Sequence, residues 1–251
     1  MKALITGASS GIGYSMAKYL SSLGYDLILV ARDKEKLQKI QKELKTDVKI
    51  VVVDLAQVSK LKDLYVVCKN DNIDILINNA GFGLFGEFNS TDLNTELNMI
   101  DVNIKAVHIL TKLFLKDMVK RNSGYILNVS SSASFQAGPL MATYYASKSY
   151  VTKLTLALYE ELRRSKSNVH VSCLCPGPVK TNFNDVANVE FAMKGMDSDV
   201  VAKYAIDKMF KKKLVIVPGF KMKCILFFNR FASNKLALKV VYKIQKRKEK
   251  K

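Results

Sequence analysis

The feature that most constrains this chain is the regular alternation of short apolar runs with longer helical patterns. The runs are rich in β-branched residues and apolar along their length, which is typical of parallel strands covered on both faces. They occupy Lys2–Thr6, Asp26–Ala31, Lys49–Val53, Ile73–Asn78, Gly124–Val129, Val169–Cys175 and Leu214–Val217. Helical patterns fall between them at Gly11–Leu23, Lys34–Lys45, Lys60–Lys69, Asp92–Lys120, Thr143–Ser165 and Asp197–Phe210. This order predicts an α/β fold with a Rossmann-like, doubly wound parallel sheet in three layers.

Length and composition agree with one domain of this class. The chain has 251 residues, of which 49% are hydrophobic, enough for a full core. Because the first strand is predicted to begin at Lys2, we expect no signal peptide, and the apolar runs are too short to span a bilayer. The cysteines show no metal-ligand spacing, so we expect buried thiols and no metal site. These features favour a cytoplasmic enzyme-sized domain.

A glycine-rich segment follows the first predicted strand and opens the first predicted helix. It reads Gly7-Ala8-Ser9-Ser10-Gly11-Ile12-Gly13, which departs from the common G-x-G-x-x-G spacing. Glycines at such a turn allow the backbone to approach a phosphate closely, and the two serines can add hydroxyl donors. The context of strand, turn and helix therefore predicts a dinucleotide site.

Two charged residues at the end of the second strand bear on the choice of dinucleotide. Arg32 and Asp33 follow Ala31. In this fold an arginine there accommodates the 2′-phosphate of NADP, whereas an acid binds the ribose hydroxyls of NAD. Asp33 can instead cap the following helix. The sequence favours NADP(H) and leaves NAD(H) open.

A tyrosine and a lysine at helical spacing supply the chemistry. Tyr144 and Lys148 share one helix face at i and i+4, and Ser131 stands thirteen residues before Tyr144. A cation beside a phenol favours the phenolate, so we expect Lys148 to lower the pKa of Tyr144. An acid–base tyrosine beside a dinucleotide site predicts hydride transfer coupled to proton transfer on a carbonyl or alcohol.

The ordered set of motifs resembles the short-chain dehydrogenase/reductase family over roughly residues 1–217. The segments that carry the resemblance are Thr6–Gly13, Asp54-Leu55, Asn78-Asn79-Ala80-Gly81, Asn103, Asn128-Val129-Ser130-Ser131, Tyr144 with Lys148, and Pro176–Thr181. The resemblance implies that the dinucleotide is held by Gly7, Ser9, Ser10, Gly11, Ile12, Gly13, Arg32, Asp54, Leu55, Asn79, Ala80, Gly81, Tyr144, Lys148, Pro176, Gly177, Val179 and Thr181.

The same resemblance assigns four catalytic residues. Tyr144 would donate the proton, Lys148 would lower its pKa and bind the nicotinamide ribose, Ser131 would hold the carbonyl oxygen, and Asn103 would position a water. This implies an NADPH-dependent oxidoreductase that reduces a ketone or aldehyde, of an apolar or acyl type. Two alternatives stay open: an NAD-linked alcohol dehydrogenase, or a non-catalytic dinucleotide-binding scaffold at a membrane.

Several apolar residues fall in loops that are expected to border the substrate. They are Phe82, Leu84, Phe85, Phe135, Leu140, Met141, Phe183 and Phe191, and they suit either an apolar cleft or ordinary core packing. The segment from Thr181 to Met196 has weak periodicity, which suits a substrate lid. In the resembled family, the long helices corresponding to Asp92–Lys120 and Thr143–Ser165 commonly pair across a two-fold axis. Here these helices carry many apolar residues, including Val107 and Leu110, so we expect a homodimer. The alternative is that the apolar tail covers this surface and keeps the chain monomeric.

The C-terminal tail carries most of the net charge. The chain has a net charge of +18, and residues 211–251 hold 14 Lys and Arg with one Glu. We therefore expect a catalytic domain at residues 1–219 and a basic amphipathic helical tail at residues 220–251, similar to the tail of a poorly characterised bacterial branch of the family. The tail either lies on the anionic inner face of a membrane or docks on the protein. It lacks a nucleic-acid recognition motif, so the expected partner is a small-molecule substrate and not a nucleic acid.

Overall fold

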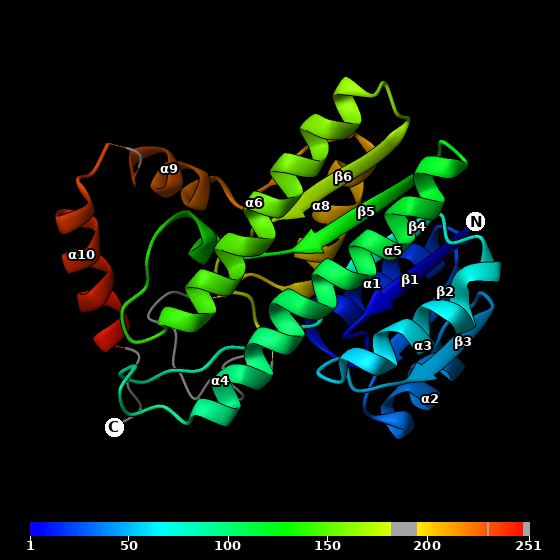
Figure 1. The fold of residues 1–251 in the computed structure, drawn as a ribbon, viewed down its shortest axis with the longest axis horizontal. Helices are drawn as coiled ribbons and strands as arrows, with labels where there is room; N and C mark the ends of the chain where they lie inside the picture. Colours follow the sequence, from blue (N-terminus) through cyan, green and yellow to red (C-terminus); the bar gives the residue numbers. More distant parts are fainter. Residues whose placement is uncertain (182–194, 230, 248–251) are drawn as a thin grey trace.

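The computed structural model describes residues 1–181, 195–229 and 231–247 and contains a seven-stranded parallel sheet (Figure 1). The strand order is β3-β2-β1-β4-β5-β6-β7. Strands β1 to β3 are added toward one edge of the sheet and β4 to β7 toward the other, so the strand order reverses between β1 and β4. The strands are β1 (Lys2–Thr6), β2 (Asp26–Ala31), β3 (Val48–Val52), β4 (Ile75–Asn78), β5 (Gly124–Val129), β6 (Val169–Leu174) and β7 (Val215–Ile216). In the central register, Ile5 pairs with Leu29 of β2 and with Ile77 of β4. Such a reversal point is where open α/β sheets bind ligands.

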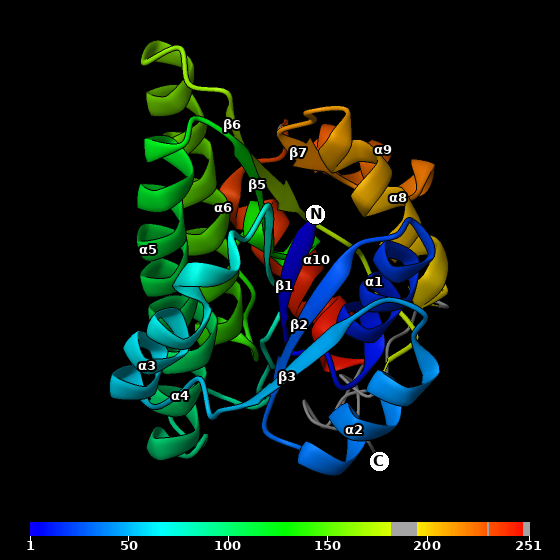
Figure 2. The same ribbon diagram turned by 90° about the vertical axis from the view of Figure 1, so that its right-hand side faces the viewer.

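Helices cover both faces of the sheet, which Figure 2 shows edge-on. One face carries α3 (Val58–Cys68), α4 (Leu93–Ile100), α5 (Val107–Lys120) and α6 (Ala142–Arg164), and the other carries α1 (Gly11–Ser22), α2 (Lys34–Glu43) and α8 (Ser198–Phe210). The central strand β1 buries both of its faces: Ile5 belongs to the core on the α1 side, and Leu4 belongs to the core on the α5 side. The predicted doubly wound, three-layered fold is confirmed.

The predicted element boundaries differ from the observed ones mainly by one or two residues, as helix and strand ends usually do. The larger difference is the helix predicted over Asp92–Lys120. The structure divides it into α4, a π-helical segment η2 (Asp101–Ala106) and α5. Short 3-10 segments follow α3 at η1 (Lys69–Asp71) and β5 at η3 (Ser132–Phe135). The π-helical segment carries Asn103, and short π-helical segments within α-helices are frequent at functional sites.

The tail forms two helices at the edge of the molecule that lies away from α2 and β3 (Figure 1). They are α9 (Phe220–Asn229) and α10 (Asn234–Lys246). The expected lid loop falls largely on residues 182–194, which lie outside the described part of the chain, as do its Phe183 and Phe191.

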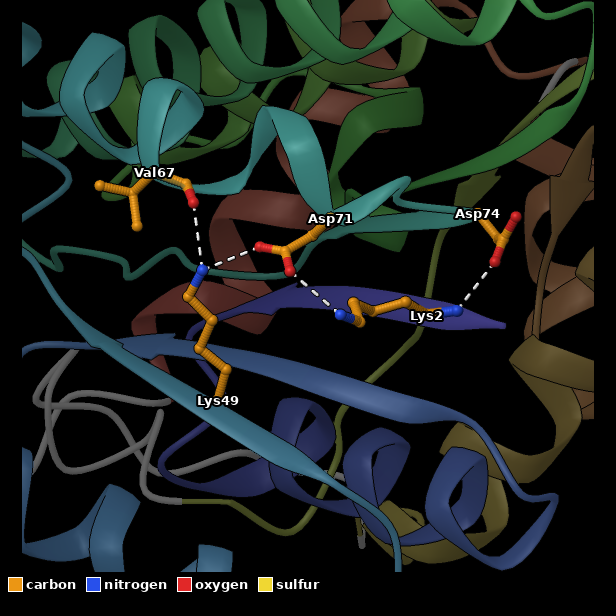
Figure 3. A network of polar contacts seen from close by, with 5 residues as sticks. All are labelled: Lys2, Lys49, Val67, Asp71 and Asp74. Atoms are coloured by element: carbon orange, nitrogen blue, oxygen red, sulfur yellow. Dashed lines mark hydrogen bonds and ion pairs between the residues drawn. The ribbon is translucent and has the colours of Figure 1, made fainter.

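A charged network braces the amino ends of the strands (Figure 3). The Asp71 carboxylate accepts a hydrogen bond from Lys2 Nζ at 3.0 Å and one from Lys49 Nζ at 2.8 Å. Lys49 Nζ also donates to the carbonyl oxygen of Val67 at 3.1 Å, and the backbone N–H of Lys2 donates to Asp74 at 2.8 Å. These contacts tie β1 and β3 to the turn before β4 at the end of the sheet opposite to the site.

Candidate active site

A cavity of about 580 Å³ follows the carboxyl ends of strands β1 to β6. Its wall contains the predicted residues Gly7, Ser9, Ser10, Gly11, Ile12, Arg32, Asp54, Leu55, Asn79, Ala80, Gly81, Ser131, Tyr144, Lys148, Pro176, Gly177, Val179 and Thr181. Two predicted site residues, Gly13 and Asn103, lie behind the wall that the described residues form. The fold thus brings segments from most of the chain length to one edge of the sheet.

The glycine-rich turn packs so closely against neighbouring atoms that a side chain at its glycines would clash with them. Gly7 and Gly11 have φ of +64° and +54°, which favours glycine, and a Cβ on Gly7 would lie 2.8 Å from the Cα of Ala80. A Cβ on Gly13 would lie 2.4 Å from the carbonyl oxygen of Gly7, so Gly13 permits close packing inside the turn and does not line the cavity. Ser10 precedes α1 without capping it through its side chain. The helix N-terminus therefore faces the cavity with its partial positive charge, which fits a phosphate group.

Hydrogen bonds from Thr6 and Asn79 hold this turn against the end of β4. Thr6 Oγ1 accepts from the backbone N–H of Asn79 at 3.0 Å and from that of Ala80 at 3.1 Å. Asn79 Nδ2 donates to the carbonyl oxygens of Thr6 at 3.0 Å and Gly7 at 3.1 Å. These hydrogen bonds fix the separation between the glycine-rich turn and the segment Asn79-Ala80.

Arg32 and Asp33 have different environments at the end of β2. Arg32 is exposed and belongs to the cavity wall. Asp33 caps α2: its carboxylate accepts from the backbone N–H of Lys36 at 3.0 Å and pairs with Lys36 Nζ at 2.9 Å. These hydrogen bonds hold the pKa of Asp33 below its ordinary value. Of the two roles left open for Asp33, the structure has the helix cap.

Tyr144 and Ser131 meet at the inner end of the cavity. Their side chains are hydrogen-bonded, and Ser131 Oγ also accepts from the backbone N–H of Ala133 at 3.1 Å. Lys148 Nζ lies 5.9 Å from the centroid of the Tyr144 ring and donates to the carbonyl oxygen of Val129 at 3.0 Å. Ser130 fixes this arrangement, because its hydroxyl donates to the backbone carbonyl of Lys148 at 2.7 Å and so ties α6 to the end of β5.

The titration of Tyr144 differs from the expectation. Burial raises the pKa of Tyr144 to about 12, and the hydrogen bond with Ser131 offsets only part of that rise. Burial also lowers the pKa of Lys148 to about 8. The expected net lowering of the Tyr144 pKa is wrong for this structure, because desolvation of the phenolate is the largest effect and acts in the opposite direction. Tyr144 therefore carries its proton at neutral pH.

Asn103 supports the wall from behind. It is fully buried, and its Nδ2 donates to the carbonyl oxygen of Phe82 at 2.9 Å and to Ser147 Oγ at 3.1 Å, while its Oδ1 accepts from the N–H of Phe82 at 3.1 Å. A Cβ on Gly81 would lie 2.9 Å from Asn103 Oδ1 and 3.0 Å from Lys148 Nζ. Asn103 and Lys148 thus converge beneath Gly81, and only a residue without a side chain fits there.

The sequence did not indicate that the tail forms part of this site. Val241 and Gln245 of α10 are buried, at 5% and 1% exposure, and Val241 packs in the same cluster as Tyr144 and Tyr145. The Nε2 of Gln245 donates to the hydroxyl of Tyr145, and Ile244 lines the cavity. The amphipathic pattern of α10 indicated a buried stripe, but no sequence signal indicated the surface that the stripe contacts.

The predicted apolar lining is confirmed in part. Phe82 and Met141 line the cavity, together with Val102 and Ala133, which the sequence had not indicated. Leu84 and Phe85 pack against the Tyr144 cluster. Phe135 lies instead in a separate depression beside α6, and Leu140 has φ of +65° in the loop before α6. Several of the residues that line the cavity near Tyr144 are therefore apolar.

Known proteins resemble this chain along most of its length. The short chain dehydrogenase family model matches residues 1–190. An uncharacterized oxidoreductase of Staphylococcus epidermidis is 37% identical over 187 residues, which are 73% of this chain and 80% of that protein.

Two solved structures share the fold. A short-chain dehydrogenase from Sphingobium yanoikuyae in complex with NADPH is 30% identical with a TM-score of 0.81 and covers 87% of this chain and 88% of its own. A short chain dehydrogenase/reductase from Burkholderia phymatum in complex with NAD is 25% identical with a TM-score of 0.83 and covers 90% of this chain and 91% of its own. The chain belongs to the short-chain dehydrogenase/reductase family of NAD(P)-dependent oxidoreductases.

Proposed function

We propose that this protein reduces an apolar or acyl-type ketone or aldehyde to an alcohol with NADPH. The observation that carries the proposal is the hydrogen-bonded pair of Ser131 and Tyr144 in the wall of the cavity, with Lys148 beside them. The pair presents two hydroxyl groups to the same volume. Two adjacent hydroxyl donors are the arrangement that a carbonyl oxygen requires as it gains negative charge.

Each polar residue has a separate role in this reaction. Ser131 holds the carbonyl oxygen, and Tyr144 donates a proton to the oxygen as it becomes an alkoxide. Lys148, as a cation held by the Val129 carbonyl, stabilises the phenolate that Tyr144 leaves behind. Asn103 fixes the backbone of Phe82 and the position of Gly81, and so positions the wall beside Lys148. A bound nicotinamide would supply the hydride.

The cavity wall supports a dinucleotide, and NADPH in particular. The open N-terminus of α1 with Ser9 and Ser10 suits the pyrophosphate. Asp54 and Leu55, which the family resemblance assigns to the adenine, also line the cavity. Arg32 offers a charge for a 2′-phosphate, whereas the carboxylate of Asp33 already caps α2. This occupation of Asp33 weakens the alternative of an NAD-linked alcohol dehydrogenase.

Location and assembly complete the proposal. We place the enzyme in the cytoplasm as a homodimer, with its tail at the inner face of a membrane. Val107 and Leu110 of α5, two of the apolar residues that prompted the dimer expectation, are buried in the core. The remaining apolar residues of α5 and α6 would have to supply the dimer contact.

A panel of carbonyl substrates with NADPH and NADH in parallel tests the function. We expect oxidation of NADPH with apolar ketones or aldehydes, and loss of that oxidation in Tyr144→Phe. A protein that binds NADPH tightly and turns over none of a broad carbonyl panel would favour the non-catalytic scaffold instead.

A further inference from the structure

The surface of α9 is largely apolar and is exposed in the part of the chain that the structure describes. Of the ten described residues of α9 none is buried, although seven are apolar. Phe220, Phe227 and Phe228 are 80%, 54% and 68% exposed, and Phe231, just beyond the helix, is 75% exposed. The Phe227 ring packs against the rings of Phe228 and Phe231, with centroids 5.5 Å apart in both pairs. Contiguous exposed aromatic side chains of this kind mark an interaction surface.

Cations lie next to this apolar surface. Val241 and Gln245 are the buried residues of α10, and they lie four positions apart on one face of the helix. The basic residues of α10 and of its C-cap are exposed: Lys235, Lys239, Lys243, Lys246 and Arg247. Residues 220–247 contain eight Lys or Arg and no Asp or Glu. Within the described part of the chain, no ion pair includes a residue of this segment, so the described cations of the segment have no carboxylate partner among the described residues.

We propose that the outer surface of α9 and α10 binds the surface of an anionic lipid bilayer. Phenylalanine side chains that enter the acyl boundary and lysines that contact anionic headgroups are the two contributions that interfacial helices combine. Among the described residues there is no helix long and apolar enough to cross a membrane. With ten residues, α9 is about 15 Å long and would lie in the plane of the interface.

Charge argues against the other obvious occupant, a second copy of this chain. A two-fold contact through this surface would bring the same segment, with its eight cations and no carboxylates, against itself. Like charges opposed in this way disfavour the contact. An anionic bilayer supplies the complementary charge that this chain does not.

The proposed surface adjoins the cavity. Met222 of α9 packs against Gly177 of the cavity wall, where a Cβ would lie 2.5 Å from the Met222 methyl group. Ile244 lines the cavity and is also 45% exposed. A bilayer on this surface would therefore lie beside the end of the cavity that takes the substrate, a placement that rests on the proposed function. Binding to lipid itself does not depend on catalysis.

Co-sedimentation of the full-length protein with vesicles tests the proposal. Vesicles of phosphatidylcholine alone are compared with vesicles that also contain phosphatidylglycerol, at low and high salt. We expect sedimentation with the anionic vesicles, less with the neutral ones, and a decrease with salt because surface charges are screened. The triple variant Phe227→Ser, Phe228→Ser, Phe231→Ser should lower the partition coefficient by more than about tenfold, since apolar area drives insertion.

Matched variants on the body serve as controls. Phe88 is 70% exposed outside the tail, so Phe88→Ser removes an exposed ring without touching the proposed surface. Lys239→Glu with Lys243→Glu reverses two tail charges and should weaken the anionic preference, whereas Lys62→Glu with Lys116→Glu on the exposed faces of α3 and α5 should retain it. Circular dichroism and NADPH binding verify that each variant is folded.

Two results would overturn the proposal. One is full-length protein that remains in the supernatant with anionic vesicles at low salt. The other is a triple phenylalanine variant that sediments with vesicles like the wild type. If vesicles fail to bind and the same triple variant converts a dimer to a monomer in sedimentation velocity, the surface contacts a second copy. Lipid binding by a protein without carbonyl reductase activity would sustain this inference while refuting the proposed function.

Discussion

Replacing Arg32 by alanine should separate the two dinucleotides more sharply than any other single change. Arg32 and Lys148 are the two cationic side chains among the described residues of the cavity wall, and Lys148 lies at the catalytic end. Arg32→Ala therefore removes the only wall cation near the end of β2 in that part of the chain. A hydrogen bond to a charged group contributes about 1.5–3 kcal/mol. The Kd for NADPH should rise about ten- to hundredfold, since about 1.4 kcal/mol corresponds to tenfold.

The Kd for NADH should change by less than about threefold in the same variant, because NADH lacks the 2′-phosphate that Arg32 would contact. Fluorescence titration of each reduced dinucleotide at fixed ionic strength measures both constants, and Lys34→Ala, an exposed charge at the start of α2, is the matched control. Asp33→Ala should lower Tm through loss of the α2 cap and leave the dinucleotide preference unchanged. Equal binding of both dinucleotides by the wild type, or equal weakening of both in Arg32→Ala, would refute the assignment.

Three other changes test separate parts of the structure. Tyr144→Phe should lower kcat at least about a hundredfold in steady-state assays while NADPH binding survives, because the phenol is the proposed proton donor. Tyr145→Phe should retain most of the turnover and lower Tm, since it leaves the buried Gln245 amide without its partner; an equal loss of turnover in both variants would contradict the assignment. Hydrogen bonds and charges from Lys49 and Lys2 hold the pKa of Asp71 below its ordinary value. The stability that Asp71 adds is therefore present above about pH 3.9 and is lost as the pH falls through the lower pKa of the folded state. In thermal melts, the Tm values of wild type and Asp71→Asn should differ at neutral pH and converge in acid. Sedimentation velocity at micromolar concentration should give a dimer, and a monomer would refute the homodimer.

The fold could be predicted because its signal is local. Strands β1, β2 and β5 have the predicted bounds, since each is an uninterrupted apolar run whose two faces are buried. The division of the long helix at Asp101–Ala106 could not be predicted. A π-helical segment continues the helix without a break, so helix-forming sequence alone does not reveal it. It depends on contacts such as those of Asn103 with Phe82 and Ser147, which join distant segments.

The parts of the site whose geometry follows from residue spacing could be predicted from the sequence. The properties that depend on burial or on contacts between distant residues could not. Tyr144 and Lys148 lie on one face because i and i+4 always do so in a helix, and Ser131 reaches Tyr144 because β5 ends beside α6. The direction of the Tyr144 pKa shift was missed because it depends on how much solvent the fold excludes. The contact between Tyr145 and Gln245 joins residues a hundred positions apart, and helical periodicity contains no information about such a partner.

Helix α6 connects the two parts of the cavity that are held in different ways. Tyr144 and Lys148 are fixed by the body, because Ser130 bonds to both the Lys148 carbonyl and the Thr152 hydroxyl, at 2.7 and 2.8 Å. Among the described residues of α10, Val241 is the buried apolar side chain, and the hydrogen bond of Gln245 with Tyr145 joins the helix to the body. The groups that transfer the proton are thus held by several buried contacts, while the opposite wall is held by few. We infer that the geometry of proton transfer depends mainly on the body of the protein, and that the range of carbonyl compounds admitted depends on how closely α10 packs against Tyr145.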